Sequence, residues 1–234
     1  MREAADATGL RVAQAKIRAS VERDLARMWQ RVWSASGGDQ YAVRDAFLRL
    51  TPGLVERYGD MAATYAADWY ERQRQAAQVS GSFSARLQPS PYLDSVEQTV
   101  QRVSGDLWTE TPEAMLHSLQ VTVGKYVLAA GRQTIVHASA EDPRASGWRR
   151  VTRVGSCKFC RMLAGRGAVY KHETAFFASH GDCNCAAVPS WDPDAPEVDV
   201  RLYQASRRTS AMTPAQKRQH NALISNFLAQ MSED

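Results

Sequence analysis

Apolar side chains recur along the first part of the chain at the spacing of an amphipathic α-helix, three to four residues apart. In the first segment these positions are Ile17, Val21, Met28 and Val32, at spacings of 4, 7 and 4. Basic and acidic residues lie largely off this stripe. The pattern predicts a helix over residues 10–33, and the glycines at positions 37 and 38 predict the break that follows it.

Three threonine–proline pairs indicate further helix starts, because threonine caps free amide groups and proline is tolerated in the first helical turn. They are Thr51-Pro52, Thr111-Pro112 and Thr213-Pro214. Apolar residues then repeat at helical spacing over residues 58–69, 96–107 and 115–136. We interpret these stripes as helix-packing faces and assign them no ligand role.

The pattern changes near residue 142. Helical spacing ends, and short β-like pieces follow at residues 148–154, 167–170 and 186–191. We expect a loop or linker at residues 79–91 and a hinge at residues 192–196, where Ser, Gly, Pro or Asp are frequent. The predicted organisation is a helical domain over 1–142, a small β-rich module over 143–192, and a linker with a tail helix over 193–234. The last helix is expected from Pro214 to Met231.

Composition places the chain among folded proteins, since 44% of its 234 residues are hydrophobic. No apolar run approaches the length of about 20 residues that spans a bilayer. The N-terminus contains Arg2, Glu3 and Asp6, so we expect no secretory signal there. The expected compartment is a reducing cytoplasm, where disulfides are disfavoured.

The net charge of +4 is unevenly distributed. No acidic residue occurs between positions 144 and 171, whereas eight basic residues do: Arg144, Arg149, Arg150, Arg153, Lys158, Arg161, Arg166 and Lys171. This run is either a solvated basic face or a surface that contacts nucleic acid or an acidic protein.

All four cysteines lie within the 29 residues from 157 to 185, in the pattern C-x2-C-x19-H-x2-C-x-C. The candidate metal ligands are Cys157, Cys160, His180, Cys183 and Cys185. Zinc takes four such ligands in a closed structural site, so one of the five is a spectator. Cys157 and Cys160 are favoured, with His180 and one of the later cysteines completing the set. If Cys183 and Cys185 lie on an extended strand, their side chains share a face and an all-cysteine site is the alternative.

Two disulfides and buried reduced thiols are the competing interpretations of these cysteines. A thioredoxin-type redox pair is disfavoured because no βαβ pattern surrounds the C-x-x-C. Structural zinc is preferred, because it replaces the hydrophobic core that a module of about 45 residues does not build. The predicted fold class is therefore mainly α: an elongated N-terminal helical region, a small zinc-stapled α+β module and a C-terminal helix.

Catalytic signatures are missing from the sequence, which has no G-x-S-x-G, no H-E-x-x-H and no phosphate-binding glycine loop. Gly165-Arg166-Gly167 is interpreted as a hairpin turn, His117 and His137 as helical residues, and His172 has no nucleophile nearby. We therefore expect a protein that is not an enzyme. A zinc-dependent nuclease or protease is the alternative. A sequence-specific zinc finger ranks last, because no helix begins between the ligand pairs in the usual register.

A family likeness rests on the same residues. The stretch Cys157-Lys-Phe-Cys160-Arg-Met-Leu-Ala-Gly-Arg166-Gly-Ala-Val-Tyr170, followed by His180-Gly-Asp-Cys183-Asn-Cys185, resembles the phage Mu F-like minor head proteins. The likeness is closest to the version found in phages of actinobacteria and covers residues 148–191. Gly181 stands where that family often has proline.

The resemblance implies a virion protein inside the head near the portal, acting in head morphogenesis, DNA packaging or DNA ejection. Its implied partners are the portal protein and other head proteins, with packaged DNA as a further contact of the basic run. Several copies around the portal are implied, with host cytoplasm as the site of assembly and no membrane involvement. Some relatives carry a fused maturation protease or ADP-ribosyltransferase, and no such domain fits within these 234 residues, which favours a structural role.

Overall fold

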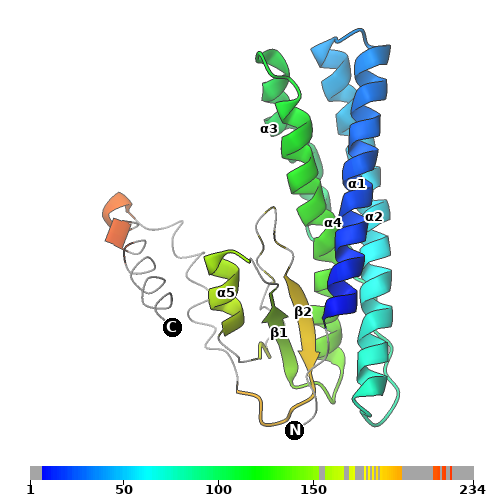
Figure 1. The fold of residues 1–234 in the computed structure, drawn as a ribbon, viewed down its shortest axis with the longest axis vertical. Helices are drawn as coiled ribbons and strands as arrows, with labels where there is room; N and C mark the ends of the chain where they lie inside the picture. Colours follow the sequence, from blue (N-terminus) through cyan, green and yellow to red (C-terminus); the bar gives the residue numbers. More distant parts are fainter. Residues whose placement is uncertain are drawn as a thin grey trace.

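The computed structural model describes residues 7–152, 156–165, 169–171, 177, 179, 181, 183, 185–196, 213–216, 218, 219 and 222. The described chain is mainly helical, as the sequence predicts, with one small sheet. Its elements are α1 (Thr8–Ala35), α2 (Gln40–Ala76), α3 (Val96–Val103), α4 (Ala114–Glu141), β1 (Gly147–Val151), α5 (Lys158–Gly165) and β2 (Ala186–Ser190), with 3-10 turns at Leu93–Ser95 and Ser104–Trp108 flanking α3. Figure 1 shows the long helices side by side, with the sheet and α5 beside one end of the bundle.

The first break falls where the sequence predicts it. Gly37 and Gly38 both have positive φ, which glycine adopts at little cost. Asp39 then caps α2, since its carboxylate accepts hydrogen bonds from the backbone N–H groups of Tyr41 and Ala42 at 2.9 and 3.4 Å.

The helix start predicted at Thr51-Pro52 is wrong. Pro52 lies inside α2, which runs without interruption from Gln40 to Ala76. A proline in a helix interior removes one backbone hydrogen bond. The helix continues through it because apolar side chains on both sides of the proline are buried in one core, among them Phe47 and Val55.

The other two predicted starts lie at or just before helices in the structure. Thr111-Pro112 precedes α4 by a short turn. Thr213 forms a reciprocal cap with Gln216, in which each side-chain oxygen accepts the other residue's backbone N–H at 3.3 and 2.9 Å. Residues 214–216, 218, 219 and 222 are helical, and the rest of the predicted tail helix lies outside the described residues.

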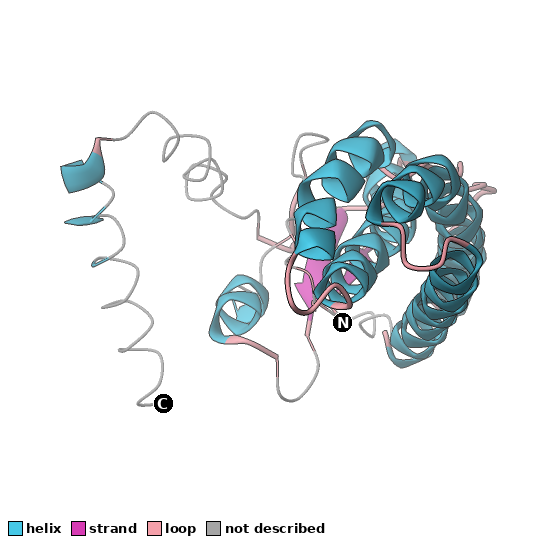
Figure 2. Cartoon of the chain, turned by 90° about the horizontal axis from the view of Figure 1, so that it is seen from above, coloured by secondary structure: helices cyan, strands magenta, loops and turns pink. Residues whose placement is uncertain are grey.

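The buried apolar side chains form two clusters. The first, which we call the bundle core, lies within the helical bundle and includes Val21, Phe47, Val100 and Leu119. The second, which we call the junction core, lies where the ends of α1, α2 and α4 meet the sheet. Figure 2, viewed from above, shows the helices gathered around one another with the strands beside them.

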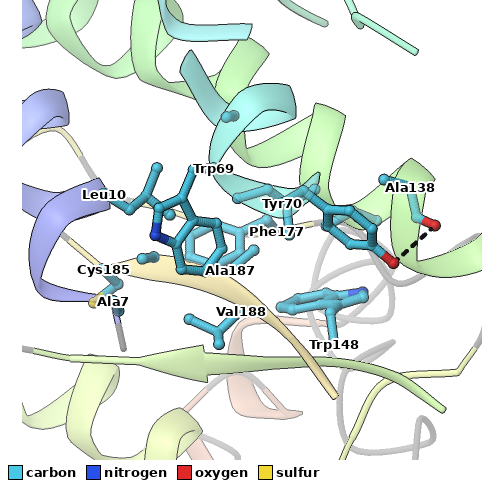
Figure 3. Packing of buried hydrophobic residues seen from close by; sticks show 14 of the residues in the cluster. Ala7, Leu10, Trp69, Tyr70, Ala138, Trp148, Phe177, Cys185, Ala187 and Val188 are labelled. Carbon is cyan, nitrogen blue, oxygen red and sulfur yellow. Dashed lines mark hydrogen bonds between the residues drawn. The ribbon is translucent and has the colours of Figure 1, made fainter. Parts of the chain in front are cut away.

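The junction core joins the helices directly to the segment that carries the cysteines. Leu10, Trp69 and Tyr70 pack in one cluster with Trp148 and Cys185. Figure 3 shows these side chains between the helices and the strands, with the Tyr70 hydroxyl donating a hydrogen bond of 3.3 Å to the Ala138 carbonyl. The β-rich segment therefore shares its hydrophobic core with the helices.

Strands form in both predicted β-like pieces, 148–154 and 186–191: β1 ends at Val151 and β2 at Ser190, and residues 153 and 154 lie outside the described ones. The two strands pair antiparallel, with Trp148 opposite Pro189. The piece at 167–170 contributes an isolated bridge between Tyr170 and Trp148. Gly147, with φ of +135°, passes so close to Tyr170 that a Cβ would lie 2.4 Å from its carbonyl oxygen. Helix α5 was not predicted, and its last residue, Gly165, belongs to the expected hairpin turn, whose other residues lie outside the described ones.

None of the described helices is long and apolar enough to cross a membrane.

Candidate metal centre

Three cysteine thiols converge within the junction core. Cys160 comes from α5, whereas Cys183 and Cys185 come from the chain just before β2. All three are buried, and their Sγ atoms lie within 4.8 Å of one another. None of the four cysteines is in a disulfide. Three buried cysteines placed in this way could hold a metal ion.

The sulfur spacing suits a tetrahedral ion. The Sγ atoms of Cys160 and Cys183 are 3.7 Å apart. Two thiolates bound to zinc at about 2.3 Å in a tetrahedron lie about 3.8 Å apart. Positions 183 and 185 are two residues apart and send both thiols to one point, as expected for extended backbone.

Of the two remaining candidate metal ligands, only Cys157 lies among the described residues. Cys157 is exposed and does not belong to the three-thiol group, although its Sγ accepts the backbone N–H of Cys160 at 3.5 Å. Cys157 lies one residue before α5 begins. His180 lies outside the described residues.

The pKa values of the three thiols are shifted in different directions. The pKa of Cys183 is lowered well below the ordinary thiol value, chiefly by a hydrogen bond from the Cys185 thiol, against the opposing effect of burial. The guanidinium groups of Arg132 and Arg150 lower it further. Burial raises the pKa of Cys160, and the hydrogen bond to Cys183 raises that of Cys185. Cys183 is thus the group on which a thiolate, the form that binds metals, is best stabilised.

Two buried arginines border the thiols. Arg132 of α4 donates from Nε to the Cys185 carbonyl at 3.1 Å and from Nη2 to the Cys183 carbonyl at 2.6 Å. Arg150 of β1 places Nη1 at 4.0 Å from the Cys183 Sγ. The Phe177 ring contacts both groups, with guanidinium carbons 5.0 and 3.8 Å from its centroid.

Sequence reasoning did not find Arg132, which was placed within a helix-packing stripe. A signal was present: it is the only Lys, Arg, Asp or Glu between Lys125 and Glu141. A lone charged residue in a helix segment that carries an apolar packing stripe indicates a buried partner.

The basic run divides in the structure. Arg144, Lys158, Arg161 and Lys171 are exposed, and Arg149 is half-buried. Arg150 departs from the expectation, because its side chain is buried against Cys183 and Phe177 and does not lie on a contact surface. Arg153 and Arg166 lie outside the described residues.

Comparison with known proteins gives one family match. Residues 1–208 match the family model described as VG15 protein. The chain is 28% identical over 180 residues to the gene 15 protein of Mycobacterium phage L5, covering 72% of this chain and 60% of that protein. It is 29% identical over 126 residues to the gene 15 protein of Mycobacterium phage D29, covering 52% and 46%. The chain thus spans less than two thirds of either relative, and no solved structure matches it.

Proposed function

Because the chain belongs to the VG15 protein family, we propose that it is a structural protein of a phage head, a minor capsid protein associated with the portal. The observation that carries the proposal is the family match over residues 1–208, together with relatives that are gene products of mycobacteriophages. The likeness of the cysteine segment to Mu F-like minor head proteins supports the same role. Head morphogenesis, DNA packaging or DNA ejection is the process it would serve.

The surface of the cysteine segment fits a contact role. Lys158 and Arg161 lie exposed on α5, and Arg144 and Lys171 lie exposed nearby in the chain. Exposed basic side chains of this kind bind phosphate backbones or acidic protein surfaces. In the proposed assembly they face the portal protein, with packaged DNA as the further contact.

The proposed metal is a structural zinc ion. Cys160, Cys183 and Cys185 supply three thiolates, and the soft sulfur donor set with near-tetrahedral spacing suits zinc. The fourth ligand comes from Cys157 or His180. The ion ties α5 to the chain before β2, two segments that no strand pairing joins among the described residues.

Cryo-electron microscopy of the virion tests the proposed location. Density for this chain is expected inside the head at the portal vertex. Purified virions whose portal vertex and head interior contain no density for it, and whose proteins do not include it, would overturn the proposal.

A zinc measurement tests the metal centre. Purified protein is expected to carry about one zinc per chain, as a single closed site requires, measured by plasma mass spectrometry. Cys160→Ser and Cys183→Ser are expected to lose it. Of Cys157→Ser and His180→Ala, the variant that loses zinc identifies the fourth ligand, and His137→Ala on α4 is the matched histidine control. Metal-free wild-type protein with intact thiols would contradict the zinc assignment.

A zinc-dependent nuclease or capsid maturation protease is the second candidate, because three thiols in place leave a fourth position that a catalytic zinc would give to water. DNA and scaffold cleavage assays of the zinc-loaded protein decide between the two. Cleavage that disappears in Cys183→Ser and in no control would favour the enzyme.

A further inference from the structure

Arg132 is a buried charge in the middle of α4. Only 1% of its surface is exposed, and it is the only Lys, Arg, Asp or Glu between Lys125 and Glu141. Its Nε and Nη2 donate hydrogen bonds to the carbonyl oxygens of Cys185 and Cys183. One guanidinium therefore holds both backbone positions that present the paired thiols.

The charge of Arg132 has no carboxylate to balance it among the described residues. The ion pairs seen there do not include it, and its Nη1 is buried without a hydrogen-bond partner. Arg74, also buried, differs because it pairs with Asp142 at 2.9 Å. A buried guanidinium is strongly disfavoured unless a negative group compensates it. Among the described residues, the groups beside Arg132 that can carry a negative charge are the thiols of Cys160, Cys183 and Cys185.

We infer that Arg132 is the positioning residue of the metal centre, fixing the Cys183–Cys185 backbone and supplying the buried counter-charge for the metal-bound thiolates. This inference rests on the proposed zinc site. Zinc with three thiolates carries one excess negative charge, and a fourth thiolate adds another. Because Arg132 binds the backbone of both Cys183 and Cys185, metal binding by these cysteines is linked to the docking of the cysteine segment on α4.

An aromatic ring shields the Arg132 guanidinium from water. Phe177 covers its guanidinium with the ring face, at 5.0 Å from the centroid. Figure 3 shows Phe177 and Cys185 packed between the helices and β2. Excluding water in this way strengthens the attraction between the guanidinium and the thiolates.

Metal affinity of four variants tests the inference. The probe is Zn²⁺ in competition with a chromophoric chelator, and Co²⁺ substitution reports the thiolate charge-transfer band. Arg132→Met is expected to weaken zinc binding by about 10- to 100-fold, the usual effect of removing an outer-shell partner of a metal site. Its cobalt spectrum at saturation is expected to match wild type, because the thiolate ligands are unchanged. Arg132→Lys keeps the positive charge but lacks the planar guanidinium that donates to both carbonyls, so a smaller loss of zinc affinity is expected than for Arg132→Met.

The controls separate metal positioning from general stability. Arg74→Met removes another buried arginine and should lower the unfolding temperature without changing zinc affinity. Lys125→Met removes a positive charge from the same helix and should also leave zinc affinity unchanged.

The outcomes are distinct. Equal zinc affinity of wild type and Arg132→Met would overturn the inference and leave the zinc site standing. If Arg132→Met does not fold, weaker binding by Arg132→Lys supports the inference, and wild-type binding by Arg132→Lys overturns it. A wild-type protein that binds neither Zn²⁺ nor Co²⁺ would remove the zinc site and the inference together, while the location in the virion would be unaffected.

Discussion

Four charged side chains are buried in the described part of the chain: Arg74, Arg132, Asp142 and Arg150. Arg132 and Arg150 adjoin the thiols, whereas Arg74 and Asp142 pair with each other. The Asp142 carboxylate also accepts hydrogen bonds from the Tyr70 hydroxyl and from Trp191 Nε1, both at 3.1 Å. One carboxylate therefore joins α2, the end of α4 and the chain that follows β2.

The pKa of Asp142 predicts how stability depends on pH. Burial raises this pKa, but hydrogen bonds from the Arg144 backbone N–H, Arg74 and Trp191 outweigh burial and hold it below the usual value. A lowered folded-state pKa stabilises the fold above the unfolded-state pKa of about 4, and this contribution is lost as pH falls through the folded-state pKa. Wild type should therefore lose stability on acidification below about pH 4.

Asp142→Asn is expected to lower the free energy of unfolding at pH 7 by about 3 kcal/mol, because it leaves Arg74 buried without a carboxylate. Its stability should also fall less than that of wild type below about pH 4. Urea unfolding at neutral and acidic pH measures both effects. Asp68→Asn, which removes an exposed carboxylate paired with Arg72, is the control and should cost about 1 kcal/mol or less. Equal losses in the two variants would contradict this account of Asp142.

At the scale of elements, the long helices pack closely because small residues lie where they meet. A Cβ on Gly131 of α4 would lie 2.7 Å from the Ala62 carbonyl oxygen of α2, too close without a shift of one helix. This contact lies one residue before Arg132, so the same approach of α2 and α4 helps to set the position of the buried guanidinium.

Gly131→Ala is expected to destabilise the protein by about 1–3 kcal/mol through overpacking against α2. Gly53→Ala in α2 is the matched control, since a Cβ there meets nothing within 4 Å. It should stabilise the protein by about 0.5–1 kcal/mol, because alanine is the better helix former. Thermal or denaturant unfolding of both variants checks the opposite signs. A stabilised Gly131→Ala protein would show that the helices are not in close contact there.

At the scale of the whole molecule, the bundle core and the junction core are separate clusters that share the same long helices. The junction core contains Cys160, Cys183 and Cys185 as well as residues of α1, α2 and α4. The candidate metal centre therefore lies in the core at one end of the helical bundle.

Metal removal is therefore expected to loosen one end of the molecule selectively. After chelation, amide hydrogen exchange should rise at the strands and at the helix ends in the junction core, including the region of Tyr70 and Ile135. Protection around Phe47 and Leu119 in the bundle core should persist. Mass-spectrometric exchange with and without chelator measures this, with a metal-free wild-type sample reloaded with Zn²⁺ as the control. Uniform loss of protection would show that the two cores unfold together.

The sequence by itself determined the helical class, the break at Gly37-Gly38, the two strand segments and the cysteine cluster. These features depend on local periodicity, glycine conformation and ligand spacing, which residues close in sequence determine. Helix continuity through Pro52 could not be predicted in this way, because it depends on burial in a core built from distant helices.

Only the tertiary structure decided which thiols converge and what surrounds them. Arg132 and Cys183 are 51 residues apart in sequence. Arg150, which the sequence predicts on a basic surface, lies against the thiol of Cys183. The physical reason is that a charge is buried only where a compensating group arrives from elsewhere in the chain. The meeting of a buried charge with a distant compensating group depends on the packed fold, and local sequence patterns do not predict it.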